Sequence, residues 1–240
     1  MKTFITFLIG DIKNITRDSM LLGSMLAPIA LALFIKLSTS HFSEFFNGIF
    51  PFSIEHHYIF IMSFVILLSP FMLGIMAGLM ILEEMDNNVL SYIAVTPVSK
   101  SGYLLYRLIV PMLISTILTI FIIIYTGLVD FTIRILPVVL MAAMITPIMA
   151  LFLAKVANNK VEGLAIGKAM GVILIVPVLT YIVESKWLLL LGVLPTFWVS
   201  EAFMKSYGMA FYSNIYILIG FCVQVIYVYI LFKMFNRKST

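Results

Sequence analysis

The sequence YIFIMSFVILLSPFMLGIMAGLMIL occupies residues 58–82 and contains no Asp, Glu, Lys, Arg or His. It is longer than the run of about 20 apolar residues that an α-helix needs to cross a bilayer. Five other largely apolar stretches of similar length are found at residues 19–37, 103–127, 133–154, 165–183 and 214–234. The sequence therefore predicts an all-α integral membrane protein with six transmembrane helices in a single domain, residues 1–240.

The composition of the chain agrees with this placement. Of its 240 residues, 62% are hydrophobic and 11% are charged, whereas soluble domains have roughly 25% charged residues. A mixed polar segment, and not a short basic region, precedes the first apolar stretch, so we expect this span to be retained in the mature protein. The single cysteine, Cys222, excludes a disulfide framework within one chain.

Lys and Arg are distributed unequally between the two sides of the predicted spans. If both termini are cytoplasmic, the inner side carries Lys2, Lys13, Arg17, Lys100, Arg107, Lys155, Lys160, Lys168, Lys233, Arg237 and Lys238. The outer side then carries only Lys36, Arg134, Lys186 and Lys205. Because an excess of cations marks cytoplasmic loops, we predict a multi-pass protein of a bacterial plasma membrane with both termini in the cytoplasm.

A short amphipathic helix, residues 84–95, is predicted in the first cytoplasmic loop. Met85, Val89, Tyr92 and Ile93 follow one another at i, i+4, i+7 and i+8, so they form one apolar stripe on such a helix. An apolar stripe outside the membrane is a surface on which a partner protein can bind.

The ends of this predicted helix carry further signals. Glu83, Glu84 and Asp86 lie near its start, where the positive end of the helix dipole favours carboxylates. Pro97 disfavours helical geometry at Thr96 and is expected to end the helix.

Two other segments are expected to lie at the membrane surface or partly within it. Residues 2–16 predict an interfacial amphipathic helix in contact with membrane lipid, and a frayed cytoplasmic tail is the alternative. Residues 184–211 are apolar but too short for a full crossing, so we expect an outer re-entrant helical hairpin before the last span. Trp187 and Trp198 are interface anchors or ordinary packing residues of this hairpin.

The second cytoplasmic loop, residues 155–168, has little apolar patterning and is expected to be a solvated connector, with a weaker partner contact as the alternative. The segment at residues 163–169 lacks the spacing and the final Ser or Thr of a phosphate-binding loop, so we predict no nucleotide site in this chain. His56 and His57 lack the spacing of a metalloprotease helix and are interpreted as a surface pair, without a bound metal.

Ionisable groups are missing from the middles of the predicted spans. Transporters driven by ion gradients keep such groups within their spans, so the energy for transport must come from elsewhere or the protein must be passive. The polar groups that are present are mild and lie within or at the ends of the spans. They line a transport pathway or cross-link helices by hydrogen bonds, and the candidates for pathway lining are Ser69, Thr116, Thr119, Thr146, Tyr181 and Gln224.

These features together resemble the type-2 ABC exporter permeases. The first similar feature is the lead-in segment, where Arg17-Asp18 precedes the first span. The second and most specific is Glu83-Glu84 followed by Thr96-Pro97, which resembles the coupling segment of the family. The third is the plan of six spans with an outer hairpin before the last. The run at residues 85–88 departs from the commonest form, and among subgroups the chain is most similar to the small drug-export permeases, including those labelled fluoroquinolone exporters.

The resemblance implies a permease subunit without catalytic residues of its own. Two separate ATPase subunits would bind ATP and magnesium, and their closure would move the helix at residues 84–95. A second permease subunit, identical or paralogous, would complete a pathway for hydrophobic or amphipathic cargo such as a drug, a peptide or a lipid. No nucleic acid is expected as a partner. The alternatives are a membrane-embedded lipid-modifying enzyme and a passive channel or regulatory membrane subunit.

Overall fold

The computed structural model describes residues 10, 16–49, 54–87, 89, 100–183, 185–207 and 210–238. Within this part of the chain every regular element is an α-helix or a 3-10 helix, and no strand is present. The prediction of an all-α protein is therefore confirmed.

Six helical stretches among the described residues are long and apolar enough to cross a membrane. They are Leu21–Thr39, Glu55–Asp86, Gly102–Thr126, Ile133–Val156, Lys160–Ile182 and Ser213–Phe235. Each overlaps one predicted span, so the six-span prediction is confirmed. The second stretch continues to Asp86 and the fifth begins at Lys160, which in both cases extends the helix several residues toward the predicted cytoplasmic side.

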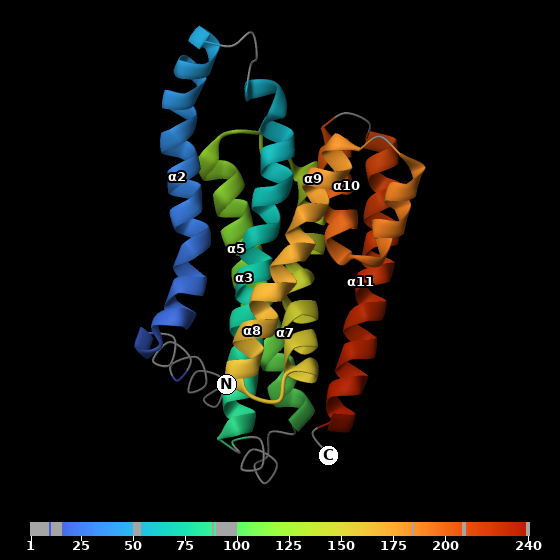
Figure 1. Cartoon of the computed structure of the whole chain (residues 1–240). Helices are drawn as coiled ribbons and strands as arrows, with labels where there is room; N and C mark the ends of the chain where they lie inside the picture. Colours follow the sequence, from blue (N-terminus) through green and yellow to red (C-terminus); the bar gives the residue numbers. More distant parts are fainter. Residues whose placement is uncertain are drawn as a thin grey trace.

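Four of the spans are single long helices and two are interrupted. The single helices are α2 (Ser19–Ile49), α3 (Tyr58–Asp86, preceded by η1, Ile54–His57), α5 (Lys100–Thr126) and α11 (Ala210–Lys238). The fourth span consists of η2 (Ile133–Ile135), α6 (Leu136–Ala143) and α7 (Ile145–Val156). The fifth consists of α8 (Lys160–Met170), η3 (Gly171–Ile175) and α9 (Val176–Ile182). The start of α2, the end of α3, the start of α8 and the end of α11 all lie at the lower end of the bundle in Figure 1.

Helices α3 and α7 form the centre of the bundle, with α2 and α11 at its two sides (Figure 1). The close approach of α3 and α7 depends on glycine. A Cβ atom at Gly74 would lie 2.7 Å from the Cβ of Met149, and one at Gly78 would lie 3.0 Å from the Cβ of Leu153. A side chain larger than hydrogen would therefore force the two helices apart, which is the small-residue packing typical of membrane helices.

The segment between α9 and α11 folds into two short helices, η4 (Lys186–Val193) and α10 (Pro195–Ser206), joined at Leu194. The joint lies against the middle of α11. The hydroxyl of Tyr227 donates a hydrogen bond to the carbonyl oxygen of Val193 at 2.7 Å, and Nε2 of Gln224 donates one to the carbonyl oxygen of Pro195 at 3.4 Å. Figure 1 shows both short helices beside the upper half of α11. The two short helices cover residues 186–206 of the predicted segment 184–211, whose residues 210 and 211 already belong to α11. Insertion of this helical hairpin into the membrane from outside stays a prediction.

The two tryptophans of this hairpin have different surroundings. Nε1 of Trp198 donates to the carbonyl oxygen of Gly192 at 2.7 Å, and the Trp198 ring packs against Gly220 of α11. Trp187 is 78% exposed. Trp198 is therefore a packing residue that holds the hairpin closed and joins it to α11, whereas the role of Trp187 as an interface anchor stays a prediction.

Candidate functional site

The acidic residues of the predicted coupling segment lie at the end of α3. Glu83, Glu84 and Asp86 occupy the last turn of this helix, which is followed by Asn87. The interpretation that they begin a new helix and are stabilised by its positive end is wrong, because they lie at the negative end of the α3 dipole, which disfavours carboxylates. Their charges must be balanced by cations from other helices.

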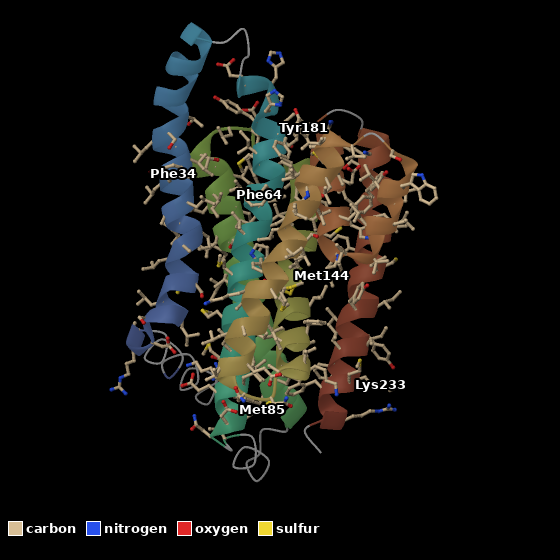
Figure 2. All side chains as sticks on the ribbon, viewed as in Figure 1. Phe34, Phe64, Met85, Met144, Tyr181 and Lys233 are labelled. Carbon is tan, nitrogen blue, oxygen red and sulfur yellow. The ribbon has the colours of Figure 1, made fainter. Side chains whose placement is uncertain are left out.

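Only two residues of the predicted apolar stripe, Met85 and Val89, are among the described residues. Met85 is half-buried and packs against the core, and Val89 is also half-buried. Figure 2 shows Met85 at the lower end of α3. Tyr92, Ile93, Thr96 and Pro97 lie outside the described residues, as does most of the interfacial helix predicted at residues 2–16. The predicted start at Glu84 is wrong, because α3 continues to Asp86. A separate coupling helix after Asn87, and an apolar stripe on it, stay predictions.

Lys160 balances two of the carboxylates. Its Nζ atom lies 2.7 Å from Oδ2 of Asp18 and 2.9 Å from Oε2 of Glu83, and its backbone N–H donates to Oδ2 of Asp86 at 2.9 Å. Asp18 itself precedes α2, where its Oδ1 accepts from the backbone N–H of Leu21 at 3.3 Å. One lysine thus joins the start of α2, the end of α3 and the start of α8.

The segment that contains Lys160 is not the solvated connector that the sequence predicts. Helix α8 begins at Lys160 and is capped by Asn159, whose Oδ1 accepts from the backbone N–H of Glu162 at 2.8 Å. Gly163 lets this helix pack directly on Leu82 of α3, because a Cβ at Gly163 would lie 2.5 Å from Cδ1 of Leu82. The irregular connection is limited to Ala157, Asn158 and Asn159.

Arg107 of α5 balances Glu84. Its Nε donates to Oε2 of Glu84 at 3.2 Å, its Nη2 donates to Oε1 of the same carboxylate, and Nε also reaches the hydroxyl oxygen of Tyr103 at 2.9 Å. The side chains of both charged residues are only 10% exposed. Breaking one partner of a buried ion pair leaves an uncompensated charge and costs about 3–5 kcal/mol, so this pair fixes α5 to α3.

We call these groups together the charge cluster. Its members are Asp18, Glu83, Glu84, Asp86, Arg107 and Lys160. They come from four helices or helix starts and meet at the end of the bundle where the chain leaves α3 for the predicted coupling segment (Figure 1). Arg17, which the sequence placed beside Asp18 in the lead-in segment, is exposed. A displacement of the end of α3 would therefore be passed to α2 and α8 through Lys160 and to α5 through Arg107.

Four of the predicted pathway residues lie inside the bundle, together with the neighbouring Ser115. They are Ser69, Thr119, Thr146 and Gln224. Thr146 of α7 donates its hydroxyl to the carbonyl oxygen of Pro70 at 3.1 Å and lies 3.0 Å from Oγ of Ser115 on α5. Ser69 and Thr119 are also fully buried, and no hydrogen-bond partner for either hydroxyl is found among the described residues. Gln224 is fully buried beside the hairpin joint. The contacts of Thr146 are those of a hydrogen-bonded link between helices.

The other two predicted pathway residues lie elsewhere. Thr116 donates to the carbonyl oxygen of Met112 in its own helix at 2.9 Å. Tyr181 lies at the upper end of the bundle (Figure 2), where its ring stacks on Phe60 with centroids 4.2 Å apart and its hydroxyl contacts Nδ1 of His57. No group of three His, Cys, Asp or Glu residues in the described part of the chain could hold a metal ion. Whether any of these six residues contacts cargo stays a prediction.

Comparison with known proteins identifies relatives along nearly the whole chain. The family model for Rv2686c-like fluoroquinolones export permease proteins matches residues 11–232. Among curated proteins, the fluoroquinolones export permease proteins Rv2686c and MT2760, from two strains of Mycobacterium tuberculosis, are each 28% identical to this chain over 233 residues. The aligned region covers 95% of this chain and 92% of each relative. No solved structure matches. The relatives and the six apolar helices place this chain in the plasma membrane as a multi-pass protein.

Proposed function

Because this chain belongs to the Rv2686c-like family of fluoroquinolone export permeases, we propose that it is the membrane subunit of an ATP-driven ABC exporter. A separate ATPase subunit would bind ATP and magnesium on the cytoplasmic side and supply the energy. This chain would supply the gated path across the membrane and no catalytic group.

The charge distribution within the bundle supports an external source of energy. Helices α3 and α5 carry their charged side chains near the ends that we propose to be cytoplasmic, and their remaining turns have none. These residues are Glu83, Glu84, Asp86, Lys100 and Arg107. Coupling to a proton or sodium gradient requires ionisable groups along the path. A motor outside the membrane that pushes on the end of α3 requires none.

The charge cluster supports a route for that push and is the observation that carries the proposal. A partner ATPase would bind the predicted coupling helix after Asn87 by the remaining members of its apolar stripe, Val89, Tyr92 and Ile93, in the manner of a helix in a groove. Movement of this helix would displace the last turn of α3. Lys160 and Arg107 would then move α2, α8 and α5 together with α3, so that the bundle would change between inward-facing and outward-facing states as a unit.

The cargo is proposed to be a hydrophobic or amphipathic drug. The names of the two mycobacterial relatives say that those proteins export fluoroquinolones, so a fluoroquinolone is the first compound to test. A hydrophobic peptide or a lipid is the alternative cargo. A second permease subunit, identical or paralogous, is proposed to complete the path.

Co-purification tests the proposal. The chain, expressed in its own host and extracted in a mild detergent, should retain an ATPase that mass spectrometry identifies by its phosphate-binding loop, and ATP hydrolysis by the complex should rise when cargo is added. Tyr92→Asp should abolish this association and leave membrane insertion intact, because it places a charge in the apolar stripe. Retention of the ATPase by the Tyr92→Asp variant would contradict the proposed docking surface.

Two other functions predict different results. A lipid-modifying enzyme would turn over lipid in the purified chain without a partner. A passive channel would let cargo equilibrate across a membrane and would not respond to ATP. Either result would replace the exporter proposal.

A further inference from the structure

A hollow with an apolar lining lies beneath the joint of the helical hairpin. Its volume is about 490 Å³, within the range of about 300–1,000 Å³ typical of ligand pockets. Helix α7, η3, the hairpin joint and α11 surround it, with side chains that include Phe152, Ile173, Val193, Ile230 and Met234. Phe152, Val193, Ile230 and Met234 are 39–67% exposed, so the hollow opens to the outer surface of the bundle.

The position of the hairpin joint explains why the hollow exists. The joint meets α11 at Gln224 and Tyr227, near the middle of Ala210–Lys238. Below this level, the hairpin no longer covers α11 and α7. A membrane has no water at this depth, and an apolar hollow of this kind stays dry, so its natural occupant is a hydrocarbon chain.

The end of α11 carries cations beside this hollow. Lys233 directly precedes the lining residue Met234, and Arg237 lies one turn further along; both are exposed. Figure 2 shows Lys233 at the lower end of α11. Helix α11 contains no Asp or Glu. Its end therefore presents a positive surface at the level of lipid headgroups, which attracts anionic lipids.

We propose that this hollow binds one acyl chain of an anionic phospholipid. The lipid comes from the leaflet at the lower end of the bundle in Figure 1, where α2 begins and α11 ends. The headgroup phosphate lies against Lys233 and Arg237, and the chain extends past Ile230 toward Val193 at the hairpin joint. The bound lipid fills the half-thickness of membrane that the hairpin leaves open between α7 and α11. This site requires only that the chain spans the membrane, so it stands or falls independently of the proposed export function.

Native mass spectrometry of the full-length chain in mild detergent tests the proposal, with phosphatidylglycerol and phosphatidylcholine of identical acyl chains as probes. The wild-type chain should retain one phosphatidylglycerol in preference to phosphatidylcholine. Ile230→Trp fills the hollow and should weaken retention at least tenfold. The matched control is Ile226→Trp, one turn earlier on α11, exposed and outside the lining; it should leave retention unchanged.

Charge variants and photolabelling keep the test independent of folding defects. Lys233→Gln and Arg237→Gln should each reduce the preference for phosphatidylglycerol about fivefold. A phosphatidylglycerol with a photoreactive acyl chain should label residues 227–234 of the wild-type chain. Equal retention by Ile230→Trp and Ile226→Trp, or labelling elsewhere only, would overturn the proposal. Retention that is indifferent to the headgroup and is abolished by a fluoroquinolone would overturn it in favour of cargo as the occupant.

Discussion

Removal of Arg107 should destabilise the protein more than removal of any exposed cation. In Arg107→Met, the buried carboxylate of Glu84, whose side chain is 10% exposed, loses both of its bonds to the guanidinium. The expected cost is about 3–5 kcal/mol. A change of 1 kcal/mol shifts the melting temperature of a chain of this size by about 2–4 °C, so the expected decrease is about 6–20 °C.

Thermal unfolding in a single detergent, followed by intrinsic fluorescence, measures this decrease. Arg17→Met is the matched control, because it removes the same charge at an exposed position; its effect should stay within about 0.5 kcal/mol. The double variant Glu84→Leu with Arg107→Met removes both charges and should recover most of the loss, with a coupling energy of about 3 kcal/mol. The reasoning fails if Arg107→Met melts at the same temperature as Arg17→Met, or if the double variant is no more stable than Arg107→Met.

Three further perturbations have defined outcomes. Lys160→Gln removes both ion pairs of a partly exposed lysine and should cost about 1–2 kcal/mol of stability. In the complex with the ATPase, this variant should lower cargo-stimulated ATP hydrolysis more than basal hydrolysis. An equal loss of both rates would argue against a coupling role for Lys160. Gly74→Val should separate α3 from α7 and cost about 1–3 kcal/mol or more, whereas Gly23→Ala, which meets nothing within 4 Å, should not lower the melting temperature. Burial and the carboxylate of Asp130 raise the pKa of Tyr207 to about 12. Because an unfolded tyrosine ionises near pH 10, the folded protein should lose stability as the pH rises from about 10 to 12. The reasoning is refuted if the wild-type chain loses no more stability in this pH window than the Tyr207→Phe variant.

The spans, and one helix face suited to close packing, could be predicted from local sequence. Apolar runs of about 20 residues indicate spanning helices without any knowledge of their neighbours. The Gly74 and Gly78 pair likewise indicates a smooth helix face, although only the structure shows that α7 is the helix that packs on it. Both signals depend on side chains that are adjacent on one helix, so one sequence contains them completely.

The charge cluster could not be predicted in the same way. Lys160 pairs with Asp18 and Glu83, which are 142 and 77 residues away along the chain, and no spacing rule relates them. The apolar run also predicts an end of the second span at Leu82, whereas α3 continues to Asp86 because nothing between these residues breaks a helix and the first proline comes only at Pro97. The sequence therefore predicts Lys160 in a solvated connector and Glu83 and Glu84 near the start of a separate helix, although tertiary contacts make all three part of the bundle.

The hairpin joint shows the same limit. The length of the apolar segment at residues 184–211 indicated that it does not make a full crossing. The level on α11 at which the hairpin turns is marked by the hydrogen bonds of Tyr227 and Gln224 to Val193 and Pro195. These partners lie about 30 residues apart and become visible only in the folded chain.

Uphill transport in proteoliposomes tests the central claim most directly. The chain should be reconstituted with and without the ATPase that co-purifies with it, and the accumulation of a fluoroquinolone against its gradient should be measured with and without ATP. Accumulation only when both the ATPase and ATP are present is the predicted result. Accumulation by the chain alone, without any nucleotide hydrolase, would contradict the account.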